Sequence, residues 1–173
     1  MVLPDKIELN DFGGDVTAYI DHLYDVYEES FYRVKINFRD KPVHVRAIPK
    51  ESNMDYSFLH ATSNGKVEAE REWDLQRAKR ISWLKPIIEG ADASANVIVW
   101  QNVRIRRAKG KKKRKSIHTN IFHLKENFLI SLHEENKVWR FLSSYHVHPD
   151  YKREKYIREH AEFMKTGIPI ETR

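Results

Sequence analysis

The chain has 173 residues, of which 40% are hydrophobic and 12% aromatic, enough apolar material for the core of one domain. It has no cysteine, which excludes disulfides and thiolate metal sites. No apolar run approaches the roughly 20 residues of a membrane helix, and the first residues lack a basic segment followed by an apolar one. We therefore expect a cytoplasmic protein with no signal peptide and no membrane contact.

The net charge of +6 is concentrated in residues 104–115, which read RIRRAKGKKKRK and contain no acid. We call this segment the basic strip. Its nine basic residues are Arg104, Arg106, Arg107, Lys109, Lys111, Lys112, Lys113, Arg114 and Lys115. Their nine positive charges exceed the net charge of +6, so the rest of the chain is slightly acidic. Dense cationic segments attract phosphate backbones through counterion release, which predicts RNA binding. A solvated loop or a contact with an acidic protein surface is the alternative.

The first part of the chain predicts one helix and two short strands. Gly13-Gly14 followed by Asp15 is typical of a helix start, with Asp15 as the N-cap. Apolar residues at helical spacing then predict an amphipathic helix over residues 16–31, whose other face is acidic. Alternation predicts strands at 33–38 and 43–48. Residues 49–69 are expected to form a loop with a short extended piece at Tyr56–His60.

A second helix is predicted over residues 72–85. Pro86 should end it near Trp83 or Leu84, because proline and the residue before it disfavour the helix interior. Four strands are predicted next, at 96–105, 116–124, 127–133 and 138–146.

Short turns join these strands except at the basic strip, and such turns favour antiparallel pairing. A charged helix from Pro149 to about Lys165 completes the chain. We therefore expect a single α+β domain over residues 1–173, with N-terminal helices packed on an antiparallel sheet of four or more strands and a C-terminal helix.

Known catalytic motifs are few in this sequence. It has no phosphate-binding glycine loop, zinc-ligand spacing or nucleophile elbow, and its carboxylates do not cluster as Mg²⁺ ligands would, so we expect no metal and no cofactor. RNA cleavage without a metal needs a base for the 2′-hydroxyl, an acid for the leaving 5′-oxygen and donors for the phosphate.

Three places offer such groups. His60 lies beside two hydroxyls and can exchange a proton near neutral pH, although it also fits a surface loop. Arg77 and Arg80 are neighbours on the predicted helix and can grip a phosphate, although they also fit a solvated face. Alternation places Ser143 and Tyr145 on the apolar face of the last strand, where they form a polar end or merely cap the sheet edge.

Four sequence pieces occur together in one order. They are F-x-H-x-T-S at 58–63, R-x-x-R-I-x-W-x-x-P-I-I-E at 77–89, I-V-W at 98–100 and F-L-[ST]-x-Y at 141–145. Together they resemble the phage- and prophage-associated nuclease-like proteins of the Barnase–EndoU–Colicin–RelE group, over about residues 32–160. The block DLQRAKRISWLKPIIE is the most specific part of the resemblance.

The resemblance implies an α+β fold whose antiparallel sheet carries a metal-independent ribonuclease site, as in the toxins of toxin–antitoxin pairs. His60 would be the acid–base residue, and Arg77 and Arg80 would hold the phosphate. Ser143 and Tyr145 would stand at the family's hydroxyl and aromatic positions. RNA would be the substrate and an antitoxin protein a partner. The basic strip is longer than the group's pattern, and the acidic helix has no counterpart in it.

Two other functions fit the same sequence. The chain is alternatively a non-catalytic module that binds nucleic acid through the basic strip. It is also a candidate protein-interaction module whose contact surface is the acidic helix over 16–31. That helix could instead fold over the basic strip and weaken RNA binding.

Overall fold

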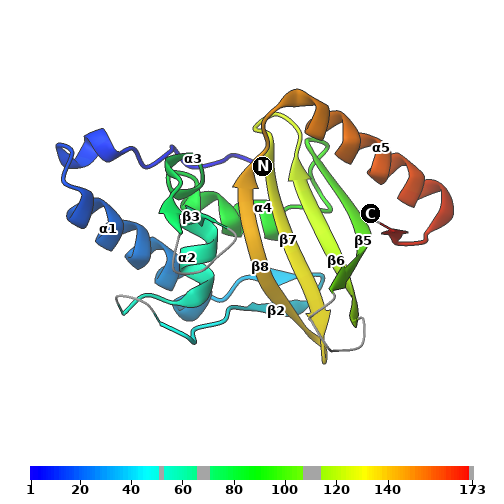
Figure 1. Ribbon diagram of the computed structural model, residues 1–173, viewed down its shortest axis with the longest axis horizontal. Helices are drawn as coiled ribbons and strands as arrows, with labels where there is room; N and C mark the ends of the chain where they lie inside the picture. The colour runs from blue at the N-terminus through cyan, green and yellow to red at the C-terminus, as the bar shows by residue number, and fades with distance from the viewer. Residues whose placement is uncertain (51–52, 66–70, 107–113, 172–173) are drawn as a thin grey trace.

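The computed structural model describes residues 1–50, 53–65, 71–106 and 114–171, and Figure 1 shows how their elements are arranged. The helical segments are η1 (Leu9–Phe12), α1 (Val16–Glu28), η2 (Glu29–Arg33), α2 (Tyr56–Thr62), α3 (Leu75–Ala78), η4 (Ile81–Trp83), α4 (Leu84–Glu89) and α5 (Asp150–Thr166). The strands are β1 (Asn37–Phe38), β2 (Lys41–His44), β3 (Ser63–Asn64), β4 (Glu72–Trp73), β5 (Val97–Arg106), β6 (Arg114–His123), β7 (Phe128–Glu135), β8 (Val138–His146) and β9 (Ile170–Glu171).

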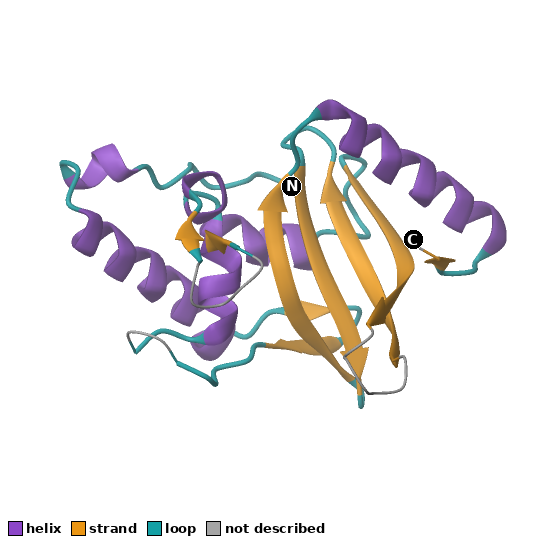
Figure 2. Cartoon of the chain, viewed as in Figure 1, coloured by secondary structure: helices purple, strands orange, loops and turns teal. Residues whose placement is uncertain are grey.

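Within the described residues, the main sheet has seven strands in the order β1-β2-β8-β7-β6-β5-β9. The long strands β5 to β8 form the predicted antiparallel meander, which Figure 2 shows face on. The sheet as a whole is mixed, because β2 pairs with β8 in parallel and β9 pairs with β5 in parallel. The expectation of an antiparallel sheet was therefore right for β5 to β8 and for β1 with β2, and wrong for the pairs β2·β8 and β5·β9. The two strands of each parallel pair are far apart in the sequence, as parallel pairing requires a long connection between them.

One face of the sheet forms the main core. Ile121, Ile130, Leu132 and Phe141 are buried there together with side chains from α1, α2 and α4. Trp139 joins this core, and its indole N–H donates to the Phe38 carbonyl across 2.9 Å. The apolar residues of β7 that alternate onto this face, Phe128, Ile130 and Leu132, are all buried in it.

The opposite face is covered only in part, by α5. Trp100, Phe122 and Leu129 pack there beneath Tyr156 of the helix. The indole N–H of Trp100 donates to the buried carboxylate of Glu159 across 2.9 Å, which anchors α5 over β5. Figure 1 shows α5 on the β5 side of the sheet and α2 beside β8, so the two helices flank the front of the sheet.

The predicted first helix is confirmed. Asp15 is the N-cap of α1, because its carboxylate accepts from the backbone N–H groups of Thr17 and Ala18. Figure 1 places α1 on the far side of the molecule from the ends of β5 and β6, where the basic strip begins and ends. As far as the structure describes the chain, this helix therefore does not cover the ends of β5 and β6, and residues 107–113 of the strip, on which the hypothesis that it folds over the strip also depends, lie outside the described residues.

Two local predictions were wrong. The expected extended piece Tyr56–His60 is helix α2, because Phe58, Ala61 and Thr62 are buried at helical spacing. The expected helix over 72–85 is instead strand β4, a helical turn capped by Asp74, a 3-10 turn and α4. Pro86 lies in the first turn of α4, where the backbone N–H that proline lacks has no helical partner to lose.

Candidate active site

The front of the sheet changes from apolar to polar beyond the cover of α5. The register aligns Asn120 of β6 and Ser131 of β7 with Ser143 of β8, and His118 lies one step further along β6 on the same face. Asn120 and Ser131 are buried, and the Ser131 hydroxyl donates to the Asn120 side chain across 2.8 Å. Burying polar groups on a sheet face costs more folding free energy than burying apolar ones. This region is therefore a candidate for function.

Of these polar residues, His118, Ser131 and Ser143 line a cavity of about 340 Å³, which we call the Ser143 cavity. Its walls come from α2 and from all four long strands. The lining residues are His60, Arg104, Ile105, His118, Ser131, Leu142, Ser143 and Tyr145. The structure thus brings together three of the five predicted catalytic residues, namely His60, Ser143 and Tyr145.

A β-bulge in β8 places Ser143 and Tyr145 in this cavity. Ser131 pairs with Ser143 while the next residue, Leu132, pairs with Phe141, so Leu142 is an extra residue. Simple alternation put Ser143 and Tyr145 on the face of Trp139 and Phe141, and that assignment was wrong. The extra residue moves both side chains to the opposite face from the core.

His60 is held by two neighbours. The Nη2 of Arg71 lies 3.0 Å from the His60 Nδ1, and the ring of Tyr56 stacks on the imidazole at 4.1 Å. Arginine can only donate a hydrogen bond, so Nδ1 must accept and the proton of the neutral ring lies on Nε2. His60 is therefore arranged as a neutral donor through Nε2 rather than as a base.

His118 is the functional candidate that the sequence analysis missed. It lies on β6 directly after the basic strip, half-buried, with its Nε2 3.1 Å from the Ser116 hydroxyl. Its ring centroid lies 6.1 Å from that of His133 on the neighbouring strand. The signal for it was a polar residue at the inward position of an alternating strand, on the same face as Asn120 and Phe122.

Tyr145 is linked to α5 and to α3. Its hydroxyl lies 2.8 Å from the Tyr156 hydroxyl, and burial raises the pKa of Tyr156 above the usual tyrosine range. The guanidinium of Arg77 lies over the Tyr145 ring, 5.4 Å from its centroid. Tyr145 is therefore fixed from both sides at the end of the cavity.

The two predicted phosphate-binding arginines have different surroundings. Arg77 donates through Nη1 to the Ser63 carbonyl at 2.9 Å and through Nε to Asp74 at 3.1 Å, and burial lowers its pKa. Arg80 does not line the Ser143 cavity. Arg80 is buried against Trp83, with its guanidinium carbon 5.2 Å from the ring centroid. Burial also lowers the pKa of Arg80. The two guanidiniums thus contact different partners, Ser63 and Asp74 for Arg77 and Trp83 for Arg80.

The basic strip meets the cavity at Arg104. This exposed side chain lines the Ser143 cavity, and Lys115 on the neighbouring strand is exposed, with its Nζ 3.2 Å from a Glu171 carboxylate oxygen. The backbones of Arg106 and Arg114 pair at the ends of β5 and β6. The other predicted strip residues, Arg107, Lys109, Lys111, Lys112 and Lys113, lie outside the described residues.

In the part of the chain that the structure describes, no three histidine or carboxylate side chains are grouped as a metal site would require. Across the same residues, every helix is too short or too polar to span a bilayer. No protein-family model matches the chain, and no significant match was found among curated proteins or solved structures. The resemblance to the Barnase–EndoU–Colicin–RelE group therefore stays a prediction.

Proposed function

We propose that this protein is a metal-independent endoribonuclease that cleaves RNA through attack by the 2′-hydroxyl, and that it acts as a toxin in a toxin–antitoxin or phage-related system. The observation that carries the proposal is the convergence of His60, His118, Ser143 and Tyr145 with Arg104 on one cavity. These groups include the donors, the cation and the proton acceptor that the reaction needs. The toxin role rests on the sequence resemblance alone.

The surroundings of each residue support a division of roles. His118 takes the proton of the 2′-hydroxyl, because its partner Ser116 is a hydroxyl that can accept from the imidazole as well as donate to it, whereas Arg71 can only donate to Nδ1 of His60. His60 donates from Nε2 to a phosphate oxygen, and Arg104 balances the charge that develops there. The Ser143 hydroxyl positions the phosphate.

Tyr145 is the remaining candidate for the acid. As the 2′-oxygen bonds to phosphorus and the bond to the 5′-oxygen breaks, that oxygen takes the Tyr145 proton. The Tyr156 hydroxyl, 2.8 Å away, stabilises the resulting tyrosinate. Water later returns the proton to Tyr145, and His118 releases the proton it gained. The products are a 2′,3′-cyclic phosphate and a free 5′-hydroxyl.

Incubation of purified protein with total RNA in EDTA tests the reaction. We expect fragments with cyclic phosphate ends from the wild type, and losses of about 100-fold or more in the His118→Ala and His60→Ala variants, as general acid–base and electrostatic groups typically contribute. His22→Ala, which removes an exposed histidine from α1, is the matched control and should cleave normally.

Two results would overturn this proposal. One is the absence of cleavage by the wild type, and the other is equal cleavage by the wild type and the His118→Ala variant. Salt-dependent RNA binding without any product would instead favour the non-catalytic module.

A further inference from the structure

A second and larger cavity adjoins the Ser143 cavity. It measures about 740 Å³ and shares His60 and Leu142 with its neighbour, so the two form a continuous depression between α2 and the sheet. We call it the Arg140 cavity. Its lining residues are Arg46, Tyr56, Ser57, His60, His133, Glu135, Arg140, Phe141 and Leu142. The catalytic roles proposed above use only His60 among them.

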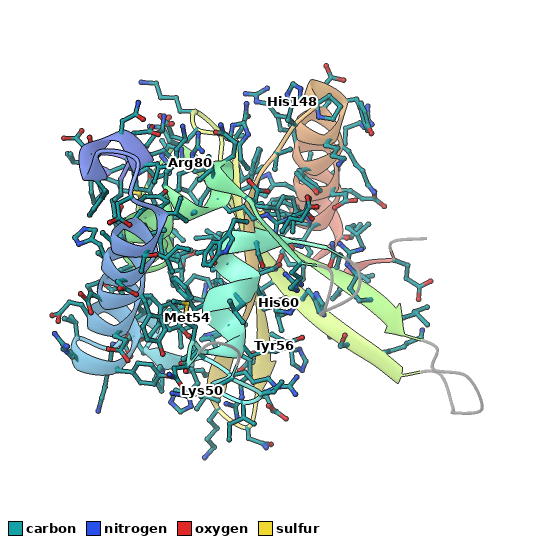
Figure 3. The ribbon with its side chains drawn as sticks, turned by 60° about the vertical axis from the view of Figure 1, so that its left-hand side comes forward. Lys50, Met54, Tyr56, His60, Arg80 and His148 are labelled. Atoms are coloured by element: carbon teal, nitrogen blue, oxygen red, sulfur yellow. The ribbon has the colours of Figure 1, made fainter. Side chains whose placement is uncertain are left out.

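Three planar groups are stacked along its wall. Tyr56 and His60 project from the same side of α2 (Figure 3), with ring centroids 4.1 Å apart and planes inclined by 29°. The guanidinium carbon of Arg46 lies 4.4 Å from the Tyr56 centroid. Tyr56 thus contacts both groups and links Arg46 to His60.

The stack ends in a planar cation that is exposed. The Nε of Arg46 donates to the Ile48 carbonyl across 2.7 Å, which fixes the guanidinium while the residue as a whole stays exposed. Guanidinium planes are surfaces on which unpaired RNA bases stack. A base stacked on Arg46 would extend the series of contacts that runs from Arg46 through Tyr56 to His60.

Arg140 supplies a second cation across the cavity. Its Nε donates to a Glu135 carboxylate oxygen at 3.0 Å, and its side chain remains 43% exposed. A guanidinium has five N–H donors, so Arg140 can bind a phosphate while it is bonded to Glu135.

We propose that the Arg140 cavity binds the nucleotide one position beyond the two that the scissile phosphate joins, with its base stacked on Arg46 and its phosphate on Arg140. This inference rests on the proposed ribonuclease function and adds that the substrate is unpaired RNA. A base within a duplex has no free face to offer, so the site selects single-stranded segments.

Short oligonucleotides with one ribose at the cleavage point and 2′-O-methyl sugars elsewhere test the site. The measured quantity is the length advantage, defined as the ratio of kcat/KM for a hexanucleotide to that for a dinucleotide. For the wild type we expect an advantage of roughly tenfold, because one stacked base contributes about that factor in affinity. An abasic residue one position beyond the cleaved pair, tried on either side, should remove the advantage on one of them.

Variants identify the surface that is responsible. Arg46→Lys keeps the charge and loses the plane, so its length advantage should fall close to one, and the abasic substitution should then cost nothing further. Arg140→Gln should reduce the advantage as well. Arg39→Gln is the matched control, because Arg39 has similar exposure and a carboxylate partner, Asp92, but lies on the β1–β2 turn. Its length advantage should equal that of the wild type.

The outcomes separate the two proposals. Cleavage with a full length advantage in Arg46→Lys would overturn the subsite and leave the ribonuclease function intact. If the wild type cleaved neither oligonucleotide, the ribonuclease proposal would fail, and binding of a fully methylated hexanucleotide would decide the subsite. Binding that is weaker in Arg46→Lys but unchanged in Arg39→Gln would support the subsite, and equal binding by all three proteins would overturn it.

Discussion

Arg71 decides which nitrogen of His60 carries the proton. The residue stands beside strand β4, outside every motif in the sequence, yet its Nη2 lies 3.0 Å from Nδ1 and its Nη1 lies 3.2 Å from the Ser63 hydroxyl. A guanidinium so placed keeps Nδ1 as an acceptor. The chemical role of His60 is thus determined by a neighbour rather than by the histidine itself.

Replacing Arg71 should therefore change the tautomer of His60. In the wild type we expect nitrogen chemical shifts that show an unprotonated Nδ1 and a protonated Nε2. The Arg71→Ala variant should show a mixture of both tautomers and slower RNA cleavage, while Arg71→Lys, which retains a donor, should lie in between. Identical imidazole shifts in wild type and Arg71→Ala would show that Arg71 does not position the ring.

At this scale the sequence predicted part of the site. His60, Ser143 and Tyr145 were identified by their place in short motifs, and they meet in the Ser143 cavity. His118 was missed because it belongs to no short motif, and only its position on one face of the strand distinguishes it. The burial of Arg80 against Trp83 was also beyond reach, because it depends on tertiary packing that helical spacing does not describe.

The bulge in β8 is the element that separates the core from the site. Ser144, which plain alternation would place on the outer face, is 1% exposed on the core side, whereas Ser143 is half-buried in the cavity. A one-residue insertion reverses the facing of every side chain beyond it.

Aspartate substitutions at these adjacent serines should have opposite consequences. Ser144→Asp buries an unpaired carboxylate and should destabilise the fold by about 3 kcal/mol or more, or prevent folding. Ser143→Asp should fold with nearly normal stability and lose cleavage, because it places a negative charge where the proposed mechanism positions the phosphate. Urea denaturation followed by circular dichroism measures the stability of both variants, and the RNA cleavage assay measures their activity. Equal destabilisation by the two substitutions would contradict the bulged register.

The elements that sequence periodicity predicted well are the long ones. The four central strands and the first and last helices each contain enough residues to show a repeated apolar spacing. Strands β2 and β9 have four and two residues, and their partners lie far away in the sequence. Such short segments have no measurable period, so their parallel pairing could not be foreseen.

On the scale of the whole molecule, buried tyrosines link stability to alkaline pH. Burial, with nearby carboxylates, raises the pKa of Tyr19 and of Tyr24 from 10.0 to about 12. Burial also raises the pKa of Tyr27, Tyr32 and Tyr156. The folded state therefore keeps protons that the unfolded chain releases above pH 10.

The stability supplied by these protonated tyrosines is complete below pH 10 and is lost as the pH rises through about 12. The urea midpoint should be nearly flat from pH 8 to about pH 9.5 and then fall steeply. Tyrosinate absorbance should rise together with unfolding. Titration of all eight tyrosines near pH 10 in the folded protein would contradict this expectation.

The charge distribution of the whole chain should appear in its salt dependence. If the basic strip binds RNA, neutralising Lys111, Lys112 and Lys113 to glutamine should lower the slope of log affinity against log salt by about 2, close to 0.7 for each lost phosphate contact on a single strand. Neutralising Lys125, Lys137 and Lys152, three exposed lysines elsewhere, is the matched control and should change the slope less. Equal slopes for both triple variants would assign the strip another role.

The short strand β9 also affects how the molecule behaves among its own copies. Within the described residues it covers the outer edge of β5 only at Asn102 and Val103, and β5 continues beyond it to Arg106. An open strand edge invites pairing with another chain, and charged side chains on that edge oppose such pairing. Arg104 stands at the first uncovered position, so the cationic end of this hairpin should also protect the protein against edge-to-edge aggregation.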